Sequence, residues 1–149
     1  MSSNKITILP ELKQPQLFKL NLNENLITSA AQFTGHVNLR ILELKKNKLT
    51  SCEGLSNLDA LEELYLNENE ITNIRHIRNM PNLKKLDLNT NKLDSFKEPP
   101  TLPALEHLDL GANVIVGADT ITHFSDFKKL RNIVVAGNPF ADELADKLK

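Results

Sequence analysis

The sequence predicts an α/β right-handed solenoid with a parallel sheet on its concave side and short 3₁₀, helical or extended segments on its convex side. A frame of the form L-x-x-L-x-L-x-x-N-x-[L/I] recurs in five consecutive copies, 22 residues apart. Within the frame, x-L-x-L-x alternates with period two, which is typical of a short strand with one buried side. Between frames, apolar residues recur at every third position, which suits 3₁₀-like or short helical turns. Because each strand is reached after one full turn of the coil, neighbouring strands must lie parallel.

Six repeats follow one another along the chain, and we expect residues 1–149 to form a single domain. Each unit contacts only its neighbours, so the core is a stack rather than a globule. The repeats begin at residues 17, 39, 61, 83, 105 and 130, and the last of them is looser in pattern.

The two ends of the chain carry incomplete patterns. Residues 4–16 resemble a partial unit, with an asparagine at the expected place and a return segment that contains Ile8, Leu9 and Leu12. Residues from about 141 to 149 predict a terminal helix. Open stacks expose apolar edges, so we expect either that these segments cover the edges or that the chain is a piece of a longer protein.

One asparagine ends each strand. Its side-chain amide both donates and accepts hydrogen bonds, so it can pair with backbone groups of the tight turn that would otherwise be buried without partners. Stacked turns then produce a ladder of buried amides, and the loss of one should cost ~1–3 kcal/mol. The predicted ladder comprises Asn25, Asn47, Asn69, Asn91, Asn113 and Asn138.

The fourth return segment departs from the repeat pattern. Residues 99–103 contain three prolines, which favour an extended path with Leu102 buried. The alternative is that Pro100 and Pro103 form a ligand for a proline-binding domain.

The fifth unit is longer than the others, because 25 residues separate the first leucine of its frame from that of the next. We expect the extra residues to form a short helix through residues 121–124. Asp119 or Thr120 is the predicted cap, and a further cap is predicted at Ser125 or Asp126.

Composition and charge argue against several classes of partner. A net charge of -1 gives no field of one sign, which disfavours nucleic acid and anionic membranes. Cys52 is the only cysteine; it falls at a core position, where we expect a buried hydrophobe rather than a reactive thiol. With no signal-peptide pattern and no apolar run near the ~20 residues that span a bilayer, a soluble cytoplasmic protein is expected.

The side chains that alternate with the strand leucines are expected to project from the concave face, the usual binding surface of solenoids. They form columns across the sheet, and the middle column combines acidic residues with the only tyrosine, Tyr65. Tyrosine gives a large contact area at little entropic cost, so we expect Tyr65 to anchor a basic segment of a protein partner. An ordinary solvated strand face is the alternative. The predicted partner-binding residues are Lys19, Glu43, Lys45, Glu63, Tyr65, Lys85, Asp87, His107 and Asp109.

The last strand differs from the earlier ones, because Val134 and Ala136 leave apolar side chains on the same face. A C-terminal segment that covers them is the first interpretation. Self-association through the exposed end of the solenoid is the second.

No catalytic, cofactor or metal site is predicted. The sequence holds no glycine-rich phosphate loop, no H-E-x-x-H and no cysteine pair for zinc. His36, His76 and His123 fall on return segments, where we expect them at the surface. His107 lies near concave-face aspartates, which is the start of an acid–base pair, but in an open groove with no evident nucleophile. A non-enzymatic protein is therefore expected.

The frame resembles that of leucine-rich repeat proteins over residues 4 to about 140. The 22-residue period is similar to the intracellular subclass typified by the leucine-rich regulatory subunit of protein phosphatase 1. The proline-interrupted fourth unit, the longer fifth unit and the closing Asn138-Pro139 look like the C-terminal half of axonemal radial-spoke leucine-rich repeat proteins.

This resemblance implies a non-enzymatic scaffold that holds another protein on its concave face. It implies a cytoplasmic location, with a cilium, flagellum or cytoskeletal assembly as the more specific setting. Two alternatives accompany it, namely the regulatory subunit of a protein phosphatase and a permanently assembled structural component.

Overall fold

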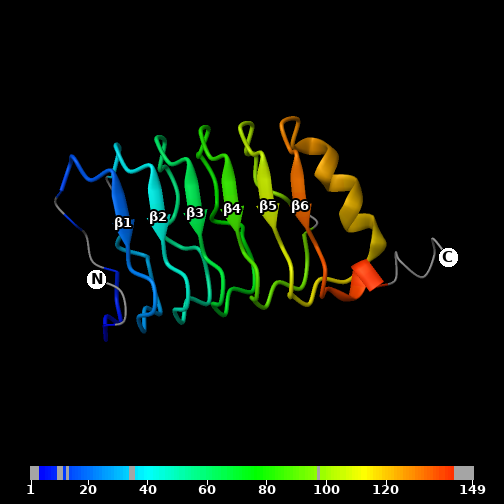
Figure 1. Cartoon of the computed structure of the whole chain (residues 1–149), viewed down its shortest axis with the longest axis horizontal. Helices are drawn as coiled ribbons and strands as arrows, with labels where there is room; N and C mark the ends of the chain where they lie inside the picture. The colour runs from blue at the N-terminus through cyan, green and yellow to red at the C-terminus, as the bar shows by residue number, and fades with distance from the viewer. Residues whose placement is uncertain (1–3, 10–11, 13, 34–35, 97, 143–149) are drawn as a thin grey trace.

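A computed structural model describes residues 4–9, 12, 14–33, 36–96 and 98–142. Six short parallel strands form one sheet in chain order. Among the described residues, the 3₁₀ helix η1 follows β5 in the chain and is seen beyond β6, at the end of the sheet (Figure 1). The elements are β1 (Lys19–Asn21), β2 (Ile41–Glu43), β3 (Glu63–Tyr65), β4 (Lys85–Asp87), β5 (His107–Asp109), η1 (Ala118–Asp126) and β6 (Asn132–Val134). The predicted solenoid with a parallel sheet is confirmed.

The strands stack in a constant register, which places equivalent residues of successive repeats side by side. Leu20 pairs with Leu42, and Leu42 with Leu64, each 22 residues along the chain. The step from β5 to β6 is longer, since Leu108 pairs with Ile133. The extra residues of the fifth unit therefore leave the sheet as η1 and do not shift its register.

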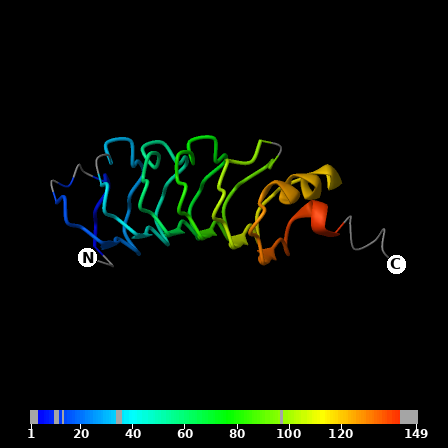
Figure 2. The same cartoon turned by 90° about the horizontal axis from the view of Figure 1, so that it is seen from above.

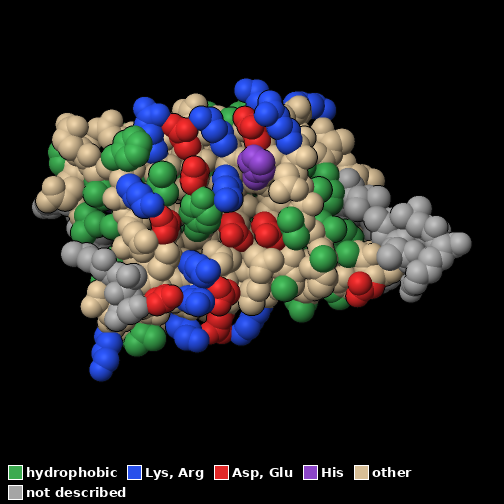
Figure 3. All heavy atoms as spheres, viewed as in Figure 1, with side chains coloured by type: hydrophobic (Ala, Val, Ile, Leu, Met, Phe, Trp, Pro, Cys, Tyr) green, Lys and Arg blue, Asp and Glu red, His purple; other side chains and the backbone are tan. Residues whose placement is uncertain are grey.

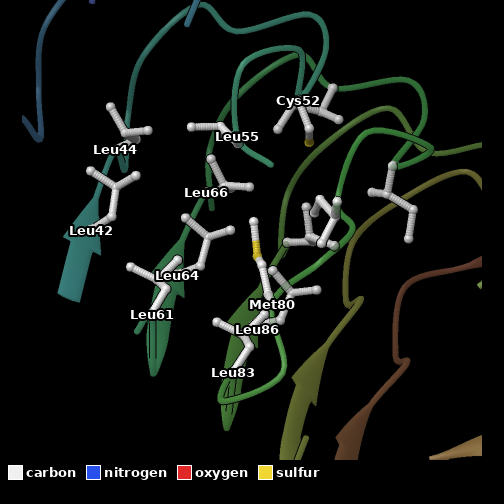
Figure 4. Close-up of a cluster of buried hydrophobic side chains, with 14 of the residues drawn as sticks. Leu42, Leu44, Cys52, Leu55, Leu61, Leu64, Leu66, Met80, Leu83 and Leu86 are labelled. Carbon is white, nitrogen blue, oxygen red and sulfur yellow. The ribbon is translucent and has the colours of Figure 1, made fainter. Parts of the chain in front are cut away.

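Leucines from the strand layer and from the return segments meet in one continuous core. Figure 2 shows the strands along one side of the coil and the return segments along the other. Between these layers Leu64 and Leu66 contact the apolar residues of the convex side, as the close-up in Figure 4 shows. Cys52 and Met80 belong to this core and are fully buried. The expected burial of Cys52 as a small hydrophobic residue is confirmed. Burial raises the pKa of its thiol to about 12, which disfavours the reactive thiolate.

The predicted hydrogen bonds between the ladder asparagines and the backbone are present in the structure. Asn69 shows the pattern: its Nδ2 donates to the carbonyls of Leu44 and Leu66, both at 2.9 Å, and its Oδ1 accepts from the Leu49 amide at 3.0 Å. One side chain thus pairs with backbone groups of its own turn and of the turn before it. The same bonds recur at Asn47, Asn91, Asn113 and Asn138.

The residue before each ladder asparagine has a left-handed backbone, which the sequence analysis did not anticipate. Thr90 is the clearest case, because a β-branched residue rarely adopts φ of 55°. The tight turn requires this conformation to bring the asparagine under the strand. The series is Glu24, Lys46, Glu68, Thr90, Ala112 and Gly137, with φ between 50° and 75°.

Most return segments are chains of isolated turns rather than helices. The expected spacing of three residues is visible in the hydrogen bonds Leu55 N to Cys52 O and Ile77 N to Ile74 O, 3.0 and 2.9 Å long. The segment of residues 99–102 has no helix or turn, and Leu102 is buried, as predicted. Use of Pro100 and Pro103 as a ligand for a proline-binding domain stays a prediction.

The helix of the fifth unit begins earlier than predicted. η1 starts at Ala118, directly after Gly117, whose φ of 89° favours glycine, and no side chain caps it. Asp119 and Thr120 lie inside the helix, so the expected caps there are wrong. The further cap predicted at Ser125 or Asp126 is also wrong, because both are at the end of η1.

The partial unit at residues 4–16 continues the ladder. The Ile6 amide donates to Asn25 Oδ1 at 3.2 Å, as the equivalent amides of the next five units do to their ladder asparagines. Leu9 is fully buried and Leu12 packs against the core, whereas Ile8 is 57% exposed, so the predicted return segment holds for Leu9 and Leu12 but not for Ile8.

At the other end of the chain a helix covers residues 139–142 and therefore begins before the predicted position of about 141. The remainder of the predicted terminal helix, residues 143–149, lies outside the described residues. Phe140, in the first turn of the helix, is fully buried.

Candidate functional site

The concave face carries all nine predicted partner-binding residues. Eight lie in the strands, where they alternate with buried leucines, and Lys45 follows just after β2. In the register of the sheet, Glu43, Tyr65, Asp87, Asp109 and Val134 form the middle column. Figure 3 shows this face, with acidic side chains in its middle and basic side chains nearer the two ends of the strands.

The first part of the face is occupied by its own hydrogen bonds. Glu43 pairs with Lys19 at 2.6 Å and accepts from the side-chain amides of Asn21 and Asn23 at 2.8 Å each. Lys45 pairs with Glu68 at 3.5 Å, away from the middle column. These charges are neutralised within the chain.

Tyr65, the predicted anchor, is held by its neighbours. Its hydroxyl donates to Glu63 at 2.6 Å, and the Lys85 ammonium lies 4.8 Å from the centre of its ring. Burial, followed by the hydrogen bond to the Glu63 carboxylate, raises the pKa of Tyr65 above its ordinary value. The phenol therefore stays protonated at neutral pH, and it is fixed in place before any partner arrives.

Asp87 and Asp109 differ from the other carboxylates of the face. They pair across β4 and β5, and no described cation lies within ion-pair distance of either carboxylate. Asp87 Oδ1 accepts from the Asn89 amide at 3.1 Å. Asp109 Oδ1 accepts from the Gly111 amide at 2.8 Å and from Asn89 Nδ2 at 3.1 Å. Asn89 thus orients both carboxylates.

The pKa of Asp87 is raised above its ordinary value. The main cause is burial, and the negative charge of Asp109 adds to it. The hydrogen bond from Asn89 and the positive charges of Lys85 and Lys45 act in the opposite direction. Two like charges directly opposite on neighbouring strands are destabilising. The face therefore keeps a concentrated negative charge that its own cations do not neutralise by contact.

Two open hollows lie on this face and share Asp87. One, of about 200 Å³, lies over β4, β5 and β6 and is lined by Lys85, Leu86, Asp87, His107, Leu108, Asp109, Asn132 and Val134. The other, of about 440 Å³, is lined by Asn23, Glu43, Lys45, Tyr65, Asn67 and Asp87. His107 lines the first hollow together with both aspartates, but neither lining contains a serine, threonine or cysteine nucleophile.

Charged side chains beyond the two ends of the strands, by contrast, pair with those of the neighbouring turns of the coil. Glu62 bridges Arg40 and Lys84, and these two hydrogen bonds lower its pKa. Glu70 pairs with Lys48 and Lys92 in the same way beyond the other end of the strands. Such columns of alternating charge align successive turns and leave little free charge for a partner.

The histidine predictions hold only in part. His36 was expected at the surface but is 3% exposed, because its ring stacks on Phe33 with centroids 4.3 Å apart. His76 and His123 are half-buried. Among the described residues, no group of three or more His, Cys, Asp or Glu side chains is arranged to hold a metal ion.

The part of the chain that the structure describes contains no helix long and apolar enough to cross a membrane.

Sequence reasoning found the columns but missed Asn89 and Gly111, which position the two aspartates. A signal was present, because both occupy the column next to the acidic one, two residues after Asp87 and Asp109 respectively. A carboxylate followed two residues later by a free backbone amide is a common local hydrogen-bonding pattern.

Comparison with known proteins supports a leucine-rich repeat protein. Residues 37–79 and 59–100 each match a family described as leucine-rich repeats in two copies. No curated protein gives a significant match. The matched segments span β2 to β4, which include Tyr65 and Asp87.

Proposed function

We propose that this leucine-rich repeat solenoid is a non-enzymatic scaffold that binds another protein on its concave face. The observation that carries the proposal is the open face of the sheet, where two hollows meet at Asp87 and a pair of carboxylates lacks contact with a cation of the described chain. Leucine-rich repeats commonly bind other proteins, and the concave side is the usual surface of solenoids for this purpose.

In this proposal the nine predicted residues form the contact surface within one domain of residues 1–149. Tyr65 remains the proposed anchor, since its ring offers contact area even though its hydroxyl is bonded to Glu63. The setting implied by the repeat pattern is the cytoplasm, with a cilium or cytoskeletal assembly as the specific proposal. Phosphatase regulation and permanent structural assembly are the alternatives.

Site-specific photocrosslinking tests the binding face directly. A photoreactive amino acid is placed at Ile41 or Lys85 on the concave face, or at Arg78 on a return segment, in cells that express the protein. The concave positions should give the same discrete adduct, and Arg78 should give none. Adducts from Arg78 alone would contradict the proposal.

Charge reversal tests which residues carry the binding. Tyr65→Ala and Asp87→Lys should each weaken the adduct while the protein stays folded by circular dichroism. Asp59→Lys is the matched control, because Asp59 is exposed on a return segment. A permanently assembled component would instead resist extraction at mild salt, and its adduct would be insensitive to these substitutions.

A further inference from the structure

We propose that the hollow over β4, β5 and β6 receives an extended peptide segment in which one arginine bridges Asp87 and Asp109 and an apolar residue two positions away contacts Val134. The inference rests on the proposed function, because it names the chemistry of the partner on the same face.

Each aspartate keeps one oxygen for a partner. Within the described residues, the hydrogen bonds to Asp87 and Asp109 all reach Oδ1. The Oδ2 atoms accept none of them. Since Asn89 holds both carboxylates by its backbone amide and its side chain, the two free oxygens are fixed before a ligand binds.

The adjacent carboxylates of Asp87 and Asp109 destabilise the fold, and neither forms an ion pair with a described residue. Like charges in direct register repel. By contrast, Glu43, in the same column, and Glu62, just before β3, are each bonded to cations. Lys85, which lines the same hollow, has its ammonium over the Tyr65 ring, 4.8 Å from the ring centre. A cation supplied by a partner would relieve the repulsion.

The spacing of the two carboxylates favours arginine over lysine. Neighbouring strands lie about 4.8 Å apart, so the two carboxylates present acceptors at a spacing that one planar guanidinium can span. Lysine is a compact, strongly hydrated point charge and lacks the planar fork of donors that matches two carboxylates at a fixed spacing. A metal ion is a poorer occupant, because His107 lines the same hollow but, among the described residues, does not form a metal-holding group with the two aspartates.

The distance from the aspartate pair to Val134 determines how many residues separate the arginine and the apolar residue in the peptide. From the midpoint between Asp87 and Asp109 to Val134 is about one and a half strand spacings, roughly 7 Å, and residues i and i+2 of an extended chain are roughly 6.7 Å apart. A segment that crosses the strands therefore places an arginine over the aspartates and its second neighbour over Val134. That side chain is 36% exposed, and Figure 3 shows hydrophobic side chains gathered near β6.

Titration of the ¹⁵N-labelled protein with synthetic heptapeptides tests the proposal by NMR. The probe Gly-Arg-Gly-Val-Gly-Arg-Gly offers the spacing in both chain directions. It should shift the amides of Asp87, Asp109 and Val134. A peptide of the same composition, Gly-Gly-Arg-Val-Arg-Gly-Gly, should bind more weakly, and replacement of arginine by citrulline, a neutral isostere, should weaken binding by about tenfold or more.

Protein variants complete the test. Asp109→Asn keeps an acceptor for Gly111 but removes the charge, so it should weaken binding of the probe to the same extent as citrulline does; Asp59→Asn should change nothing. Equal shifts from the arginine and citrulline peptides, or binding that survives Asp109→Asn, would overturn the inference. If crosslinking still maps a partner to Ile41, the scaffold proposal stands and only the partner chemistry fails. If no concave position crosslinks, the scaffold proposal fails as well.

Discussion

At the scale of single residues, two adjacent positions of every repeat do opposite things to stability. The ladder asparagine pairs buried backbone groups with three hydrogen bonds, while the residue before it adopts a left-handed backbone that L-residues disfavour. The hydrogen bonds of the asparagine stabilise the turn by more than the left-handed residue destabilises it, because a buried backbone group without a partner costs more free energy than one strained residue. The two positions are therefore open to substitutions with opposite outcomes.

Substitution of Asn69 by alanine should lower the free energy of unfolding by at least about 2 kcal/mol, since it leaves an amide and two carbonyls without their partner. Urea unfolding followed by circular dichroism measures the change. Asn67→Ala is the matched control, because Asn67 is half-buried on the concave face and outside the ladder; its effect should stay within about 0.5 kcal/mol. Similar losses for the two variants would contradict the structural role of the ladder.

Substitution of Thr90 by glycine should raise the free energy of unfolding by roughly 0.5 kcal/mol. Relief of the left-handed conformation is worth ~1–2 kcal/mol, and the added freedom of glycine in the unfolded chain takes back ~0.5–1 kcal/mol. Thr72→Gly, at an exposed threonine outside the left-handed series, should instead destabilise the protein. Thermal unfolding of both variants reports the sign, and a loss of stability at Thr90 would show that the turn does not strain the threonine.

At the scale of elements, each strand is too short to define a surface, and the face is made by the register between strands. The columns could be predicted from the sequence because the 22-residue period alone sets which residues align. The pairing of charges was not predicted, since it depends on side-chain reach: Glu43 bonds Lys19 on the neighbouring strand, while Asp87 turns to the Asn89 amide. The start of η1 was missed because Gly117 sets it by its backbone and not by a side-chain cap.

The pair of strands β4 and β5 makes a prediction about pH. The pKa of Asp87 is raised in the folded state, so between its ordinary and raised values the folded protein binds more protons than the unfolded chain. The stability that this proton contributes is present at low pH and is lost as pH rises through the raised value. Asp87→Asn carries no charge at any pH and therefore avoids this loss of stability. Its free energy of unfolding should exceed that of the parent protein by ~0.2–1 kcal/mol at neutral pH, and the difference should shrink toward about pH 3.

Urea unfolding across this pH range checks the sign. Glu43→Gln is the contrasting variant, because Glu43 is bonded to Lys19 and to two amides. It should lower stability at neutral pH. A gain in stability for both variants would mean that the whole face, and not the aspartate pair, carries the excess of negative charge.

At the scale of the whole molecule, the solenoid is a one-dimensional stack, so position along it should decide how far a local defect spreads. Leu20 and Leu64 hold the same place in β1 and β3, yet Leu20 is 8% exposed and Leu64 is fully buried between two neighbouring strands. The repeat pattern predicts both as core leucines and does not separate them. Their difference arises from the number of turns that flank each one.

Leu64→Ala should therefore cost more than Leu20→Ala, near the upper end of the ~2–5 kcal/mol range for leucine truncation, with Leu20→Ala near the lower end. Hydrogen exchange should separate the two further. Leu64→Ala lies between the halves of the stack and should speed exchange of the slowest amides in both, whereas Leu20→Ala should affect mainly β1 and β2, because β4 and β5 keep all their neighbours. A uniform loss of hydrogen-exchange protection in Leu20→Ala would show that the stack opens only as a whole. In such a stack, a partner bound over β4 to β6 would stabilise β1 as strongly as β5.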